Sequence, residues 1–188
     1  MSAADPLAWR YDAALREVPV DAKAFAQAVD RCVEEIAAAR SQPKRLLAML
    51  GEATPLLRIA GRLEEARRTA SAAIAIAELL EDARAAFASR VGLAAVMQWE
   101  GRFELSTPLF DQLIAEARGT PALADLADEV LQQAGKNLLQ QRRYAEAARC
   151  FRDALKLRRA KGDDALMEAS AEALRVTQAA EQAAGMRR

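Results

Sequence analysis

The sequence predicts an all-α protein made of stacked helix pairs, and three observations point to this class. Apolar residues make up 52% of the chain whereas aromatic residues make up only 5%, and small apolar side chains such as Ala favour helices that pack closely. Apolar residues recur at helical spacings within segments that end at Gly, Pro or a short polar turn. One pattern of small and bulky residues also recurs three times along the chain, and internal repetition is the signature of stacked repeat units.

The first 42 residues are expected to form a flexible tail, at residues 1–5, and a capping helical hairpin, at residues 6–42. Asp5 precedes a proline and so suits the start of the first helix. Asp21 can cap the second helix. The two helices are expected at about 6–17 and 22–40.

Seven further helices are expected from residue 43 onward, and no strand is expected. Their ranges are about 43–60, 63–80, 83–99, 103–117, 121–140, 144–159 and 164–183. Pro55 is expected to kink or split the first of these seven helices, and Pro108 to mark the first turn of the fourth. Nine helices are therefore predicted in all.

The internal repeat is clearest at the corner between two helices. Leu63, Phe103 and Tyr144 coincide when the copies are stacked, at spacings of 40 (103 − 63) and 41 (144 − 103) residues. Further positions agree in size in the same register: Ala66 with Ser106 and Ala147, Ala70 with Phe110 and Phe151, and Thr54 with Ala94 and Gly135. Helical periodicity alone does not produce this agreement, because it repeats every 3.6 residues and sets no longer spacing.

These copies resemble the tetratricopeptide repeat family, whose units carry small residues where two antiparallel helices cross and an aromatic residue at the start of the second helix. The best match is formed by Gly135, Tyr144, Ala147, Phe151 and Ala154. The spacing exceeds the usual 34 residues and is similar to the longer-helix type seen in kinesin light chains and in large ATP-dependent bacterial transcription activators. The copies depart from the pattern at Leu113, Ala70 and Arg142.

The resemblance implies a right-handed α-α superhelix, which is a solenoid of stacked helix pairs with helical caps. Its three repeats would occupy about 43–81, 82–119 and 120–162, within 43–162 as a whole. Residues 163–188 would form a C-terminal capping helix and tail. Stacking would bury the apolar faces that a single helix pair leaves exposed.

The resemblance also implies a concave face that binds an extended peptide or a partner helix. Carried over by register, this face would hold the following residues: Arg58, Gln98, Trp99, Gln132, Gln133, Lys136 and Gln140. The long polar side chains can hydrogen-bond the backbone of a partner, and Lys136 can meet a carboxylate. Two alternatives stay open, an ordinary solvated helix face and, for Trp99, a partly buried residue at a helix end. The asparagine clamp of chaperone-binding family members is not expected, since Asn137 lies one residue out of register.

Charge gives little support to nucleic-acid or membrane binding, because 27 basic residues balance 27 acidic ones. A basic stripe runs along one predicted helix and consists of Arg149, Arg152, Lys156 and Arg159. It is either a binding patch or a solvated face, and the sequence leaves both open.

No feature of the sequence indicates an enzyme, a cofactor or a metal site. The chain has no histidine, which is the commonest general base and metal ligand, and it has no phosphate-binding or nucleophile motif. Cys32 and Cys150 have no local partner and are expected to be small buried apolar residues. No signal peptide or long apolar run is present, so a cytoplasmic protein is expected.

The function that we expect is that of a protein–protein interaction adaptor or scaffold, in the form of a monomer or weak homo-oligomer. The alternative is a self-associating structural or regulatory protein of a bacterial signalling or secretion system, with a chaperone-like role.

Overall fold

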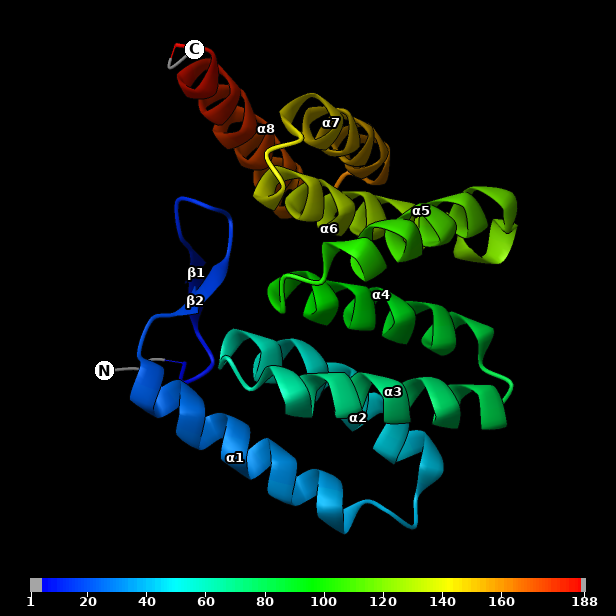
Figure 1. Ribbon diagram of the computed structural model, residues 1–188. Coiled ribbons are helices and arrows are strands. Elements are labelled where there is room, and N and C mark those ends of the chain that lie inside the picture. Colours follow the sequence, from blue (N-terminus) through cyan, green and yellow to red (C-terminus); the bar gives the residue numbers. More distant parts are fainter. Residues whose placement is uncertain (1–4, 187–188) are drawn as a thin grey trace. The chain divides into compact units, whose positions relative to one another are not determined.

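The computed structural model describes residues 5–186, and over this part of the chain it consists of eight α-helices, one 3-10 helix and one β-hairpin (Figure 1). The α-helices are α1 (Ala22–Ala38), α2 (Pro43–Ile59), α3 (Leu63–Leu79), α4 (Ala83–Trp99), α5 (Phe103–Gly119), α6 (Ala127–Gln140), α7 (Tyr144–Lys161) and α8 (Asp164–Gly185). The 3-10 helix η1 covers Pro121–Leu126. The all-α class is confirmed, with helices that pack in sequence and antiparallel. Residues 1–4 of the expected N-terminal tail, and the end of the C-terminal tail, lie outside the described residues.

The expected first helix, and with it the capping pair of helices at 6–42, is wrong. This segment instead forms strands β1 (Trp9–Tyr11) and β2 (Glu17–Pro19), which pair antiparallel, so the expectation of no strand is also wrong. Aromatic and β-branched residues favour the extended conformation. The backbone N–H of Asp12 donates to the Arg16 carbonyl, and the Asp12 carboxylate accepts from the Arg16 N–H, both at 2.9 Å. These bonds close a turn that competes with a helix.

The prolines interrupt fewer helices than expected. Helix α2 runs through Pro55 without a break, and Pro108 lies inside α5 rather than in its first turn. Pro121 opens η1 instead of a long α-helix, and α6 begins at Ala127. An interior proline removes one backbone hydrogen bond, a loss that packing on neighbouring helices can offset.

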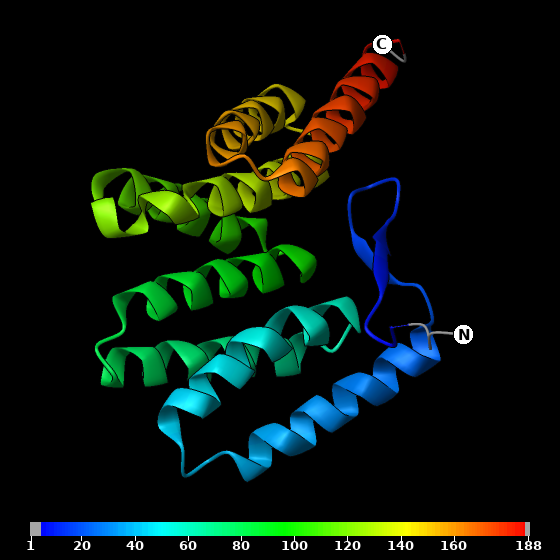
Figure 2. The same ribbon diagram turned by 180° about the vertical axis from the view of Figure 1, so that it is seen from behind.

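The chain divides into two compact units. The first comprises the segment that ends at Asp12 together with residues 16–101. Helix α2 lies at its centre and packs against α1, α3 and α4, and β2 also contacts α2 (Figures 1 and 2). The core contains mainly the following residues: Phe25, Val29, Ala53, Leu57, Ile59, Ala66 and Val96.

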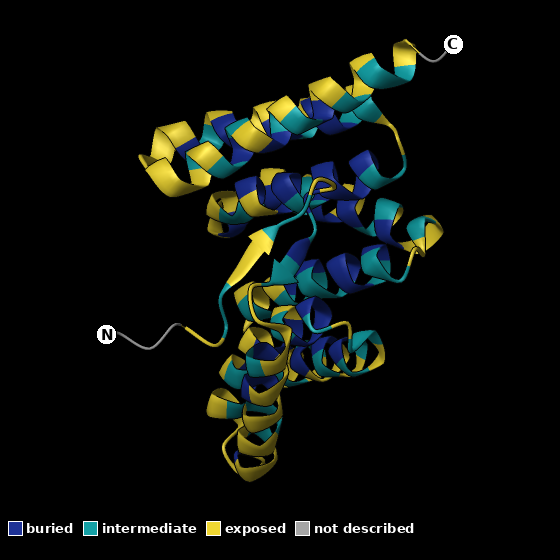
Figure 3. Cartoon of the chain, turned by 90° about the vertical axis from the view of Figure 1, so that its left-hand side faces the viewer, coloured by how far each residue is buried: buried dark blue, intermediate teal, exposed yellow. Residues whose placement is uncertain are grey.

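The second unit comprises residues 13–15 and the segment from Arg102 onward. Each of its helices packs on the next, from α5 to α8, and α6 also contacts α8. Its core cluster is Leu15, Leu138, Leu139, Ala147, Phe151 and Ala173. The division falls after Gly101, inside the segment 82–119 that was expected to form one repeat. In both units the buried residues lie along the helix sides that face other helices (Figure 3).

Three corners share one backbone conformation, at the spacing that the sequence predicts. Gly61, Gly101 and Arg142 have left-handed φ values of 76°, 75° and 59°. The residue that follows each of them has φ/ψ of −84°/60°, −84°/61° and −85°/62°. In the first corner, Gly61 N–H donates to the Arg58 carbonyl and the next N–H donates to the Leu57 carbonyl, which is the Schellman pattern of helix ends.

The small residues of the register are buried as the repeat predicts. Ala66, Ser106 and Ala147 are all fully buried, one turn into α3, α5 and α7. The third helix pair is the tightest, because a Cβ atom on Gly135 would lie 2.6 Å from the ring of Phe151. The small residues thus let paired helices approach closely.

Candidate partner-binding site

The last turns of α2 and α4 bring two predicted site residues together in the first unit. The Arg58 guanidinium lies 4.8 Å from the centre of the Trp99 ring, and the Arg16 guanidinium lies 5.5 Å from it. Cations at such distances are attracted to the face of an indole ring. Arg58, Trp99 and Arg16 therefore form a cluster that we call the Arg58–Trp99 site.

The N-terminal hairpin supplies a carboxylate to the Arg58–Trp99 site. Nη1 of Arg58 donates to Oε2 of Glu17 at 2.9 Å, and each of these residues is only 5% exposed. A buried charge is costly unless it is paired and hydrogen-bonded. Glu17 on β2 thus neutralises a guanidinium that α2 holds away from water.

Local sequence explains why the helix side of this site is fixed. Arg58 lies in the last turn of α2, and its carbonyl accepts the N–H of Gly61 at the corner. Its neighbours Leu57 and Ile59 belong to the buried core. Trp99 is the last residue of α4. The corner geometry therefore sets the position from which the Arg58 side chain leaves the helix.

Gln98 is almost completely buried, with 1% of its surface exposed. Its side-chain oxygen has no hydrogen-bond partner among the described residues, and such an unsatisfied group costs free energy. Gln98 is thus buried inside the protein, although it directly precedes Trp99 in the sequence, and its side chain is not on the surface where a partner would bind.

The four predicted site residues of α6 do not form one open polar face. Gln132 and Lys136 are each 4% exposed, and the Gln132 side-chain oxygen accepts from the Ser170 hydroxyl of α8 at 2.9 Å. Gln133 donates to Glu129 on its own helix at 2.8 Å. Gln140 is half-buried, and its side-chain oxygen lacks a hydrogen-bond partner among the described residues. Helix α8 thus occupies the side on which Gln132 lies.

A buried ionic network in the second unit was missed by reasoning from the sequence. Arg158 is 1% exposed, and its Nε donates to the Asp128 carboxylate at 2.9 Å while Nη1 donates to the Ser170 hydroxyl at 2.9 Å. Lys161 also donates to Asp128. The signal was present in the register, since Arg158 takes the position of Ala117 (117 + 41) in the preceding copy. An arginine at a buried small-residue position needs a buried acid.

A second polar cluster explains the position of Asn137. The Ser106 hydroxyl donates to the Asn137 side-chain oxygen at 2.7 Å, and the Asn137 amide donates to the Thr107 hydroxyl at 2.9 Å. Asn137 thus joins α6 to α5 and has both ends of its side chain satisfied.

The basic stripe of α7 lies on the surface. Arg149, Arg152, Lys156 and Arg159 are all exposed, and Arg149 has Glu146 at 4.0 Å. An exposed pair at that distance contributes little to stability.

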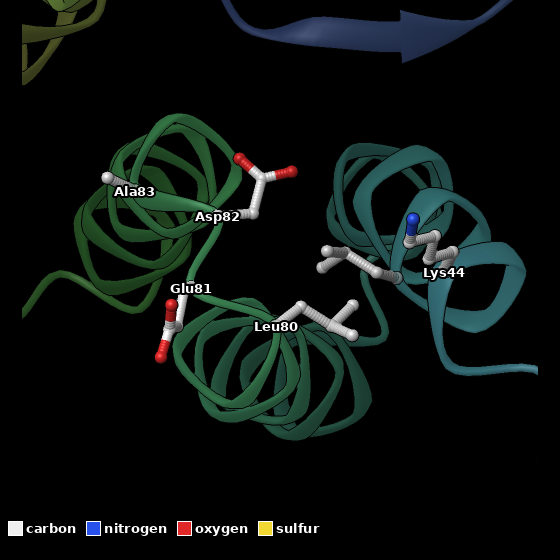
Figure 4. Close-up of a pocket in the computed structure, with 6 residues that line it drawn as sticks. Lys44, Leu80, Glu81, Asp82 and Ala83 are labelled. Carbon is white, nitrogen blue, oxygen red and sulfur yellow. The ribbon is translucent and has the colours of Figure 1, made fainter.

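A separate hollow of about 480 Å³ lies where α2 begins, α3 ends and α4 begins. It is lined by Lys44, Leu47, Leu80, Glu81, Asp82 and Ala83 (Figure 4). The Asp82 carboxylate accepts the Ala85 N–H at 2.9 Å and so caps α4. Asp82 therefore has a structural role at the start of α4.

The two cysteines are half-buried rather than fully buried. Burial raises the pKa of the Cys150 thiol to about 11. A thiol with a raised pKa is a poor nucleophile at neutral pH, so the environment of Cys150 does not favour a reactive thiolate.

No family model and no curated protein matches this chain. None of the helices formed by the described residues is long and apolar enough to cross a membrane.

Proposed function

We propose that this chain is a protein-binding adaptor built as a solenoid of three tetratricopeptide-like repeats. In this proposal the ends of α2 and α4 hold an extended segment of a partner protein. We further propose that it binds its partner in the cytoplasm and has no catalytic activity of its own, in keeping with a sequence without histidine.

The observation that carries the proposal is the presence of an extended strand on the Arg58–Trp99 site. Strand β2 contacts α2, and its Glu17 forms a buried ion pair with Arg58. Extended segments that dock through a few anchoring side chains are a common mode of peptide recognition. Trp and Arg are the residue types that most often dominate binding energy at protein interfaces.

The repeated corners support the repeat architecture. Gly61, Gly101 and Arg142 share the left-handed conformation at spacings of 40 and 41 residues. Repeat proteins use such regular stacking to present extended binding surfaces.

Affinity capture from a lysate of the source organism, followed by mass spectrometry, tests the adaptor function. Trp99→Leu is expected to reduce capture of the specific partner at least tenfold, because the variant loses the aromatic ring of the site. Trp9→Leu is the matched control, since Trp9 is an exposed tryptophan of the hairpin that packs edge-to-face on Tyr11. The melting temperature of each variant is measured alongside. Equal capture by wild type and Trp99→Leu, or no specific capture at all, contradicts the proposal.

A further inference from the structure

The Arg58–Trp99 site has a permanent part and a removable part. Arg58 and Trp99 belong to helices, whereas Arg16 and Glu17 belong to the hairpin. Without the hairpin, the helices would present a guanidinium beside an indole ring. We propose that this helix side is a binding site for an acidic side chain on an extended strand, and that Glu17 is its tethered occupant. This inference rests on the proposed function and names the chemistry of the partner.

The occupant of the Arg58–Trp99 site has to carry a negative charge. The side chains of Arg58 and Glu17 are each 6% exposed in their 2.9 Å ion pair. Replacing the carboxylate by a neutral group leaves a buried guanidinium without a counter-charge, which is strongly unfavourable. A strand that displaces Glu17 must therefore bring an Asp or Glu of its own.

The ring of Trp99 adds a second requirement. Its face lies near Arg58 and also near Arg16, and Arg16 comes from the hairpin, one residue before Glu17. Arg16 lies at the end of the turn, and Glu17 is the first residue of β2, so the two side chains need not alternate as they would within a strand. The expected partner motif is thus an acidic residue that opens an extended strand, with a basic residue in the turn directly before it.

The hairpin has little stability of its own. Its two strands have three residues each, and an isolated two-stranded hairpin is marginally stable in water. Leu15 at its turn has a left-handed φ of 59°, which is unfavourable for a side chain with a Cβ atom. The contacts that hold this segment on the first unit include the ion pair of Glu17 with Arg58 and the packing of Leu7 against the core cluster. A competing strand has to displace the Glu17 contact.

A peptide with the sequence of residues 6–20, labelled with fluorescein, tests the site by fluorescence anisotropy on the full chain. We expect the peptide to bind the Glu17→Gln chain at least tenfold more tightly than the wild-type chain, because the tethered competitor has lost its charge. A peptide that carries Gln in place of its own Glu17 is expected to bind at least tenfold more weakly than the natural peptide. Equal affinities of the two peptides, equal affinities of the two chains, or no binding to a folded Glu17→Gln chain would overturn the proposal.

Hydrogen exchange of the wild-type chain keeps the proposal testable if the Glu17→Gln chain loses its helical circular dichroism. The Val20 N–H, which donates to the Ala8 carbonyl at 3.0 Å, is expected to exchange at least a hundredfold faster than the core amides of α2. Exchange at the same rate as α2 would mean that the hairpin opens only with the whole unit, which overturns its role as a removable occupant.

The outcomes for this site and for the adaptor function can be separated. The variant with both Glu17→Gln and Arg58→Gln removes the ion pair without leaving a buried charge. Arg118→Gln with Asp153→Asn is the matched control, because that pair is exposed. If lysate capture persists in the first variant while peptide binding is lost, the adaptor function survives and this site is not its partner surface. If the peptide binds but nothing is captured, the site stands and the adaptor function fails.

Discussion

At the scale of single residues, the corner at Arg142 shows how a repeat tolerates a mismatch. Arg142 has a φ of 59°, where the two equivalent corners have glycine. A left-handed conformation costs a residue with a Cβ atom roughly 1 to 2 kcal/mol. The corner still forms, because Arg142 N–H and the next N–H donate to the Leu139 and Leu138 carbonyls.

Arg142→Gly is therefore expected to raise the free energy of unfolding by about 1 kcal/mol. The Arg142 side chain is exposed, so its removal loses little packing. Urea denaturation followed by circular dichroism measures the change. Gly61→Ala is the reverse control and is expected to lower stability by about the same amount, since its φ of 76° is equally strained for alanine and no atom obstructs the new Cβ. A neutral result for both variants would contradict the assignment of these corners as left-handed.

Gly135 is the residue at which the helix crossing is tightest. Gly135→Ala is expected to destabilise the protein by about 2 kcal/mol, because the new methyl group would lie 2.6 to 2.8 Å from the Phe151 ring. Gly51→Ala in α2 is the matched control, since its Cβ meets nothing within 4 Å and alanine favours a helix by up to about 1 kcal/mol. A lower melting temperature for Gly135→Ala and a higher one for Gly51→Ala would support the close helix crossing. Higher melting temperatures for both variants would refute it.

At the scale of elements, the buried network of Asp128 and Arg158 joins α6, α7 and α8. Burial opposes ionisation of Asp128, but hydrogen bonds from Lys161 and Arg158 outweigh it and lower the pKa of the carboxyl. The equivalent position in α4 is Phe87 (128 − 41), which is fully buried. The third helix pair therefore has a buried charge at a position where the second has a buried aromatic ring.

The lowered pKa of Asp128 fixes the sign of a pH dependence. Since ionised Asp128 is favoured by folding, its contribution is present above its ordinary pKa of about 4 and is lost as the pH falls through the lowered value. Asp128→Asn is expected to cost about 3 kcal/mol at pH 7, because the buried Arg158 loses its buried acid and keeps the exposed carboxylate of Glu129 at 3.3 Å. The difference from wild type should shrink as the pH falls below about 4 and through the lowered pKa of Asp128, as measured by urea denaturation at each pH. A difference that stays constant would show that Asp128 does not ionise in the folded protein.

At the scale of the whole molecule, the two proposed roles differ in their state of association. If the protein is a monomeric adaptor, light scattering is expected to give a mass of 20.4 kDa that does not change with protein concentration. Self-association is supported by Leu79 at the end of α3, which is 77% exposed. An exposed apolar side chain of this size can pack against a second copy of the chain. A mass that rises towards twice the monomer value, and that Leu79→Ser returns to the monomer value, would favour the self-associating alternative.

The sequence by itself determined the helices after residue 43, except for the 3-10 turn at Pro121–Leu126, and the register of the three corners. Both depend on local signals, namely helical periodicity, Gly at helix ends and small residues at Ala66 and Ala147. The departures of Arg142 and Arg158 from the register are also present in the sequence. Their effect on stability depends on the neighbouring groups in the folded protein, which are the carbonyls of the corner for Arg142 and the Asp128 carboxylate for Arg158.

Only the tertiary structure decided the N-terminal hairpin and the state of the predicted site residues. The segment around Tyr11 and Glu17 carries signals for both helix and strand, and the turn bond of Asp12 with the docking of Glu17 on Arg58 favours the strand. Likewise, the sequence predicts that Gln132 lies on the surface, but in the structure α8 covers it and Ser170 donates a hydrogen bond to its side chain. Register identifies which residues share a helix face, but contacts between segments distant in sequence determine whether that face is open or covered.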